Sequence, residues 1–163
     1  MVHIKQIVVS VLVLGATLWF SGCATQTSTH AASPELLPMQ SNVVQYALSL
    51  KGAPYRYGKD SPTEGFDCSG FIKHVYEKQG FALPRTAQEM AKQLPYCPAE
   101  KMQAGDLVFF NTNGAAYSHV GLYLGDEKFI HAPSQNTGKV LISDFNNNYW
   151  KKHFTGVRRP LPQ

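Results

Sequence analysis

The sequence predicts an α+β domain, in which helices from the N-terminal part pack on an antiparallel sheet of about five strands. Two observations predict it. Between residues 41 and 94, apolar residues recur at helical spacing in three segments. From residue 106 on, short runs of β-branched and aromatic residues alternate instead with turn signals. Because helices and strands do not alternate along the chain, a parallel βαβ sheet is not expected.

The three helices are marked by residues that favour helix ends. Ser41 is a candidate cap before the apolar stripe of residues 43–50. Asp67 is a strong N-cap candidate for a second helix, which Gly80 would stop. The third helix opens with the Thr-Ala-Gln-Glu capping box at residues 86–89. We therefore expect three helices in the first part of the domain.

The second part of the chain predicts an antiparallel meander. Its apolar runs are separated by the segments NTNG, GDE and SQNTG, which are rich in residues that favour turns. Short strands joined by tight turns pair with their neighbours in the chain. The predicted strands are residues 106–110, 119–124, 128–131 and 140–142.

The composition is that of one ordinary globular domain. The chain has 163 residues, of which 44% are hydrophobic and 16% are charged, so it is not a disordered polyelectrolyte. Its net charge of +4 comes from scattered lysines and arginines rather than from a basic stripe. A nucleic-acid-binding surface would need such a stripe. We therefore expect no nucleic-acid partner, and we expect a monomer.

The first 22 residues are expected to be a signal peptide. Lys5 precedes a nearly unbroken apolar run over residues 7–20, which is too short to span a bilayer comfortably. The run ends in Ser-Gly before Cys23 and resembles the lipobox of bacterial lipoproteins, although Phe20 stands where leucine is usual. This resemblance implies that Cys23 becomes the acylated N-terminus of the mature protein. A simple secreted protein is the alternative.

The residues after Cys23 are expected to form a tether. Residues 23–39 are small and polar, contain prolines and show no periodicity, as in a flexible linker. Ala24 is not the aspartate associated with retention in the inner membrane, so the lipobox resemblance implies the periplasmic face of the outer membrane. Residues 40–163 are left for the single folded domain.

Cys68 falls in the first turn of the second predicted helix. A thiol attacks as its thiolate, and the start of a helix favours an anion by about 0.3–1 kcal/mol. That is less than one pKa unit, so a nucleophilic cysteine here would also need a base. Export places the chain in an oxidising compartment, which leaves a structural disulfide with Cys97 as the alternative.

Two of the six histidines are candidates for that base. His119 begins one predicted strand, His131 ends the next, and the two lie symmetrically about Gly125. A hairpin centred on Gly125 would place their Cβ atoms about 5 Å apart. This predicts a base on the sheet that faces the cysteine and is oriented by a third polar group. The remaining histidines lie in the signal, the tether, another face of the second helix and the C-terminal segment: His3, His30, His74 and His153.

Six segments taken together resemble a known family. GAPYRYGKDSPTEGFDCSGF, LPRTAQEM, QAGDLVFF, SHVGLYLG, KFIHAP and YWKKHFTGVRRP resemble, in that order, the motifs of NlpC/P60 cell-wall cysteine peptidases. The resemblance covers about residues 40–160 and implies a compact papain-like α+β fold. It implies that Cys68 is the nucleophile, that His119 is the general base and acid, and that His131 holds the His119 ring.

The same resemblance implies supporting roles around Cys68. Tyr55 matches a family tyrosine near the cysteine, which implies that it completes an oxyanion hole with the Cys68 backbone N–H. Tyr57 is expected to pack. Asp67 and Ser69 are motif residues for which both helix capping and substrate binding are open.

The reaction implied by the resemblance is hydrolysis of peptidoglycan stem peptides through a thioester on Cys68, without a cofactor. The D-alanyl-diaminopimelate cross-link is the first bond implied, because single-domain lipoproteins of the family resemble enzymes that cut it. The γ-D-glutamyl-diaminopimelate bond is the alternative. An amidase or acyltransferase on the same fold, and a non-enzymatic wall-binding lipoprotein, also remain open.

A metal site is the other class of site that these residues bring into question. Cys68, Cys97, His119 and His131 count to four possible ligands. Their spacing contains neither CxxC nor HExxH, the patterns that zinc sites commonly use. We therefore expect no metal.

Overall fold

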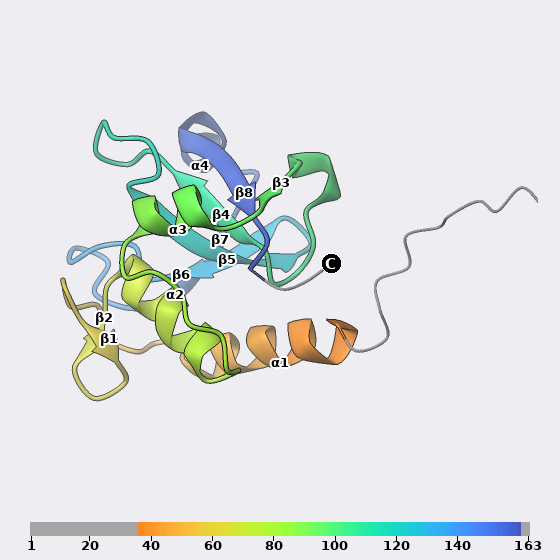
Figure 1. The fold of residues 1–163 in the computed structure, drawn as a ribbon. Helices are drawn as coiled ribbons and strands as arrows, with labels where there is room; N and C mark the ends of the chain where they lie inside the picture. The colour runs from red at the N-terminus through yellow and green to blue at the C-terminus, as the bar shows by residue number, and fades with distance from the viewer. Residues whose placement is uncertain (1–35, 161–163) are drawn as a thin grey trace, which may run out of the picture. The chain divides into compact units, whose positions relative to one another are not determined.

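The computed structural model describes residues 36–160 of the chain. The predicted signal peptide, the lipidation site at Cys23 and most of the predicted tether lie outside the described residues. Residues 36–160 form an α+β fold with mixed helices and an antiparallel sheet, as expected (Figure 1). No helix in this part of the chain is long and apolar enough to cross a membrane.

The first helix, α1, starts earlier than its predicted cap. It spans Leu36–Ser49, so Ser41 lies inside the helix and the end of the predicted tether is helical. Pro38 is compatible with this start, because the first turn of a helix does not use the proline's missing N–H. Val43 and Ala47, four residues apart, are fully buried and attach the helix to the core.

The caps of the next two helices are confirmed. Helix α2 spans Cys68–Glu77 with Asp67 as N-cap, whose side chain accepts a hydrogen bond from the Gly70 N–H. Helix α3 spans Ala87–Gln93 behind the predicted capping box of Thr86 and Glu89. Both caps are local in sequence, which is why the sequence alone identifies them.

The predicted meander is confirmed, and it is part of a larger sheet. Six strands lie in the order β3-β8-β4-β5-β6-β7, with every neighbouring pair antiparallel. The last strand of the chain inserts between β3 and β4, a pairing that the sequence did not indicate. The strands are β3 (Tyr96–Cys97), β4 (Leu107–Phe110), β5 (His119–Gly125), β6 (Lys128–His131), β7 (Leu141–Asp144) and β8 (Phe154–Arg158).

Both faces of the sheet are covered. On β4, Leu107 and Phe109 join the core beneath α1, α2 and α3, whereas Val108 and Phe110 join a second apolar cluster on the opposite face. The second cluster includes Trp150 from α4 (Asn148–His153), a short helix that the sequence did not predict. Figure 1 shows α2 and α4 on opposite sides of the sheet. Burial on both faces explains why β4 reads as a continuous apolar run.

The loop between α1 and α2 is folded tightly against the start of α2. It contains a two-stranded hairpin, β1 (Asp60–Ser61) with β2 (Gly65–Phe66). A Cβ atom on Gly70, in the first turn of α2, would lie 2.2 Å from the carbonyl oxygen of Lys59 in this loop. Only glycine allows this approach. The close contact fixes the N-terminus of α2, and therefore Cys68, relative to the loop.

Candidate active site

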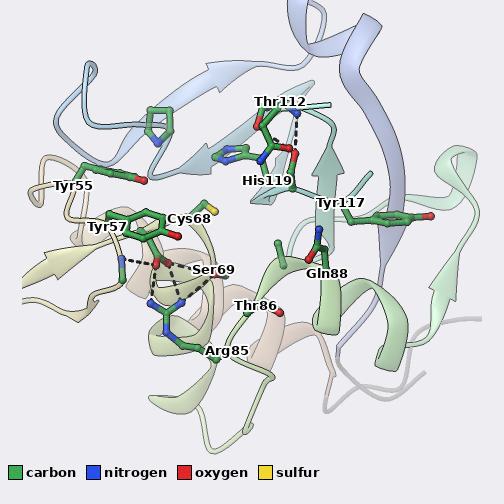
Figure 2. Close-up of a pocket in the computed structure, with 16 residues that line it drawn as sticks. Tyr55, Tyr57, Cys68, Ser69, Arg85, Thr86, Gln88, Thr112, Tyr117 and His119 are labelled. Carbon is green, nitrogen blue, oxygen red and sulfur yellow. Dashed lines mark hydrogen bonds and ion pairs between the residues drawn. The ribbon is translucent and has the colours of Figure 1, made fainter. Parts of the chain in front are cut away.

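A pocket of about 600 Å³ lies where the start of α2 meets the sheet. Its lining comes from the loop before α2, the first turns of α2 and α3, the segment that leads into β5, and Pro133 after β6. Figure 2 shows Tyr55 and Tyr57 on one side of the pocket, Gln88 and Tyr117 on the other, and Cys68 near the middle. The fold thus brings residues from five separate segments to one opening.

Cys68 is the first residue of α2, as predicted, and it lines this pocket. Burial raises the pKa of its thiol, and the neighbouring Asp67 carboxylate raises it further. The backbone N–H groups of Val120, Ser69 and Cys68 act in the opposite direction and lower the pKa. The anion-favouring helix start is therefore outweighed by burial. The thiol is protonated at rest and needs a nearby base to become a nucleophile.

His119 and His131 lie side by side, as the hairpin argument predicts. Nε2 of His119 is 2.7 Å from Nδ1 of His131. The predicted register is wrong by two residues, because Leu122 pairs with Ile130 and the turn is centred on Asp126 instead of Gly125. The two histidines are therefore diagonal neighbours on one face of the sheet, a separation that long side chains still bridge.

Gly121 leaves the space that this diagonal contact needs. A Cβ atom at Gly121 would lie 2.6 Å from Cδ2 of Phe129 and 3.3 Å from Cβ of His131. Phe129 is fully buried in the second apolar cluster and has little room to move. A side chain at position 121 would therefore push against the Cβ atom of His131.

Both imidazoles are neutral at rest. Burial lowers the pKa of His119 to about 4. Burial and the neighbouring His119 lower the pKa of His131 well below its usual value. A buried imidazolium is disfavoured unless a negative group faces it, so each ring keeps one acceptor nitrogen. His119 shares the pocket with Cys68, and a neutral ring there can accept a proton.

Two further contacts hold the histidine pair, and the sequence did not indicate either. Nε2 of His131 is 2.9 Å from the Ser143 hydroxyl on β7. The indole of Trp150 on α4 stacks on His119 and meets His131 edge-on, with ring centroids 5.7 Å and 5.0 Å away. Of the described aromatic side chains, only Trp150 contacts both imidazoles. In the sequence, the only signal for Trp150 is its place in the C-terminal motif YWKKHFTGVRRP.

Asp67 and Ser69 line the pocket, but their polar atoms already have protein partners. The Asp67 carboxylate accepts from the N–H groups of Gly58 and Gly70 and forms a two-pronged ion pair with Arg85, with distances of 2.7 and 3.0 Å. Arg85 also donates to the Ser69 hydroxyl at 3.1 Å. In the structure, Arg85 lines the pocket and braces the N-cap of the cysteine helix.

The two tyrosines of the loop differ from the expectation in one respect. Tyr55 lines the pocket, and burial together with the nearby Cys68 raises the pKa of its phenol, so Tyr55 stays a hydrogen-bond donor. Tyr57 was expected to pack, but it is 85% exposed at the rim. The N–H of the next residue, Gly58, donates to Asp67, which anchors the turn that carries Tyr57.

Cys97 lies away from the pocket lining. Its sulfur accepts from Arg159, which also forms an ion pair with the buried Asp106. Both Cys68 and Cys97 are free thiols. In the part of the chain that the structure describes, no three His, Cys, Asp or Glu side chains are placed to hold a metal ion. Cys97 therefore belongs to a structural cluster apart from Cys68 and the two histidines.

Comparison with known proteins points to one family. The sequence profile of the NlpC/P60 family matches residues 52–159. The chain is 42% identical over 115 residues to the murein DD-endopeptidase MepH of Escherichia coli, a match that covers 68% of this chain and 42% of MepH. It is 40% identical over 143 residues to the gamma-DL-glutamyl hydrolase of Bacillus subtilis, covering 86% of this chain and 34% of that protein.

A solved structure shares the fold. An NLP/P60-family protein of Staphylococcus aureus described as similar to lipoprotein superposes with a TM-score of 0.70 at 36% sequence identity, covering 85% of this chain and 46% of that one. The chain thus spans less than half the length of these three proteins. The likeness covers the segment that holds Cys68, His119 and His131.

Proposed function

Because this chain belongs to the NlpC/P60 family, we propose that it is a cysteine peptidase that hydrolyses peptide bonds in the stem peptides of bacterial peptidoglycan. One observation carries the proposal: Cys68 shares a pocket with His119, and His119 is hydrogen-bonded to a second histidine. This is the set of groups that nucleophilic acyl transfer needs. The relative named a murein DD-endopeptidase supports the substrate class.

In the proposed mechanism, His119 is the general base. The raised pKa of the Cys68 thiol and the lowered pKa of His119 favour a neutral thiol and a neutral imidazole at rest. The thiol proton then moves to His119 as the sulfur attacks the peptide carbonyl. The Cys68 backbone N–H and the Tyr55 hydroxyl would stabilise the resulting oxyanion.

The same histidine completes the reaction. Protonated His119 gives its proton to the amine as the C–N bond breaks and the amine departs. The acyl group remains on Cys68 as a thioester. A water molecule then loses a proton to His119 and attacks the thioester. The carboxylic acid leaves, the proton returns to the sulfur, and the enzyme is regenerated. His131 holds the His119 ring in place throughout these steps.

Two bonds are candidates for cleavage. We propose the D-alanyl-diaminopimelate cross-link first, since the relative named a murein DD-endopeptidase is 42% identical to this chain. The second candidate is the γ-D-glutamyl-diaminopimelate bond, because the gamma-DL-glutamyl hydrolase matches a larger share of the chain. Either bond would have to enter the same pocket, which the ion pair between Asp67 and Arg85 lines.

We further propose that the mature chain is lipid-anchored through Cys23 at the periplasmic face of the outer membrane. The Ser-Gly-Cys sequence after the apolar run supports lipidation, and Ala24 supports the outer membrane. The domain would act as a monomer, because one copy supplies all three proposed catalytic residues. Palmitate labelling tests the anchor: label should enter the wild-type protein and be absent from Cys23→Ala.

Mass analysis of muropeptide digests tests the activity and the bond together. A DD-endopeptidase converts cross-linked dimers to monomers with the gain of one water and leaves uncross-linked peptides intact. A γ-DL-endopeptidase shortens uncross-linked peptides as well. Release of glycan from an intact stem peptide would reveal an amidase instead, and unchanged dimers and monomers would refute the proposed hydrolysis.

A further inference from the structure

Three polar side chains form a continuous hydrogen-bonded line across the sheet. The His119 ring bonds to His131 at 2.7 Å, and the other nitrogen of His131 bonds to the Ser143 hydroxyl at 2.9 Å. The three residues come from neighbouring strands β5, β6 and β7. The direction in which hydrogens run along this line determines what His119 can do.

Only one direction leaves His119 a base. If Ser143 donates to Nε2 of His131, then Nδ1 of His131 carries a hydrogen and donates to Nε2 of His119. The hydrogen of a neutral His119 then sits on Nδ1, so the ring has no acceptor for the thiol proton of Cys68. If Ser143 accepts instead, Nε2 of His131 carries the hydrogen, and Nδ1 of His131 accepts from Nε2–H of His119. Nδ1 of His119 is then free to accept the thiol proton of Cys68.

The position of Ser143 favours the accepting direction. Ser143 lies on β7, the strand at the edge of the sheet, and its side chain is only half-buried. Its hydroxyl hydrogen can therefore point to water while its oxygen accepts from His131. His131 itself is fully buried. Without Ser143, its Nε2–H would therefore be buried with no acceptor, which costs the desolvation of that group.

We propose that Ser143 is a positioning residue that accepts a hydrogen bond from Nε2–H of His131, fixes the tautomer of His131, and so keeps Nδ1 of His119 free as the proton acceptor. Ser143 touches neither substrate nor Cys68 in this scheme, and it acts through the histidine pair. The inference rests on the proposed function, since it assigns a base to that reaction. The hydrogen placement can nevertheless be measured without any substrate.

Nitrogen-15 NMR of the labelled protein reads the tautomer directly. The expected wild-type spectrum shows a protonated Nε2 and an unprotonated Nδ1 on His131, and the same arrangement on His119. Ser143→Ala should give a mixture of tautomers, whereas Ser143→Thr, which keeps the hydroxyl, should restore the wild-type pattern. Ser134→Ala removes an exposed hydroxyl that bonds only to Thr137 and serves as the control.

Kinetics on the muropeptide substrate supply the second readout. We expect kcat to fall about tenfold in Ser143→Ala, as for the loss of one hydrogen bond, with KM unchanged and kcat recovered in Ser143→Thr. A hydrogen on Nδ1 of His131 in the wild type, or an unchanged tautomer in Ser143→Ala, would overturn the proposal. A wild-type protein with the expected tautomer but no hydrolysis would refute the proposed function and leave the hydrogen-bond direction standing.

Discussion

The indole of Trp150 lies nearly parallel to the imidazole of His119, with ring centroids 5.7 Å apart and ring planes inclined by 25°. The contact joins α4, near the end of the chain, to the first residue of β5. Trp150 also packs against Phe110 and Phe129. It therefore closes the second apolar cluster over the side of the histidine pair that faces α4.

Removing this cover should change the pH dependence of hydrolysis. Burial lowers the pKa of His119 to about 4, so its imidazole stays neutral in mildly acidic solution. Trp150→Ala would admit water, which moves the pKa up toward the ordinary value of about 6.5. We expect kcat/KM of this variant to fall between pH 6 and 5, where the wild type is still active. The measurement is kcat/KM across that range.

Trp150→Phe is the matched variant for this test. It keeps an aromatic ring over the pair and should keep the wild-type acid limb. Circular dichroism at each pH separates the effect from unfolding. If folded Trp150→Ala shows the same acid limb as the wild type, Trp150 does not determine the environment of His119.

A side chain at Gly121 should disturb the histidine pair. A Cβ atom there would approach Phe129 to 2.6 Å, closer than real Cβ contacts, and His131 to 3.3 Å. We expect Gly121→Ala to lower the free energy of unfolding by about 1–3 kcal/mol, as overpacking does, and to reduce kcat. Urea unfolding gives the first quantity and muropeptide hydrolysis gives the second. Wild-type values for both would show that the sheet absorbs the methyl group easily.

The local features of this site follow from the sequence. Asp67 and Thr86 predict the starts of their helices, because an N-cap bonds to N–H groups only a few residues away. Cys68 follows from Asp67, and the two histidines follow from two apolar runs around a turn signal. The register of that hairpin does not follow, because an irregularity between Tyr123 and Gly125 moves the turn.

The long-range partners of the site could not be read in this way. Arg85 reaches Asp67 across 18 residues, Arg159 reaches Asp106 across 53, and Trp150 meets His119 from a helix with a short, mostly polar sequence. Such pairings depend on tertiary packing, which no local pattern encodes. Strand β8 was missed for a similar reason, since it contains Gly156 and polar residues and is held by its neighbours β3 and β4.

The ion pair between Asp106 and Arg159 should stabilise the fold without taking part in catalysis. The Asp106 side chain is 1% exposed and that of Arg159 is 12% exposed, and neither lines the pocket. Arg159→Ala would leave a buried carboxylate without its partner, so we expect a loss of about 3–5 kcal/mol in the free energy of unfolding. Urea unfolding checks this value.

Lys59→Ala removes a solvent-exposed ion pair with Glu64 and should leave the unfolding midpoint unchanged. Below its unfolding transition, Arg159→Ala should hydrolyse muropeptides with the wild-type kcat. Equal stability losses in the two variants would contradict the special role of the buried pair.

Tyr57 should contribute to substrate binding. Its side chain is 85% exposed at the pocket rim, and the turn that carries it is anchored by the hydrogen bond from Gly58 to Asp67. Substrate can therefore contact an aromatic ring that loses little conformational entropy on binding. We expect Tyr57→Ala to raise KM about threefold to tenfold with kcat nearly unchanged. Steady-state kinetics on a defined muropeptide measure both. Tyr96→Ala is the control, because Tyr96 is 68% exposed and does not line the pocket. A similar KM for both variants would show that Tyr57 does not bind substrate.

The most direct test of the account compares the two free cysteines as muropeptide hydrolases. Cys68 lines the pocket with His119, whereas Cys97 belongs to the Asp106 and Arg159 cluster. Release of products from muropeptides, followed by mass, should fall at least about a thousandfold in Cys68→Ala, since the covalent step is lost. Cys97→Ala should keep the wild-type rate while folded. Wild-type product release by folded Cys68→Ala would contradict the central claim that Cys68 is the nucleophile.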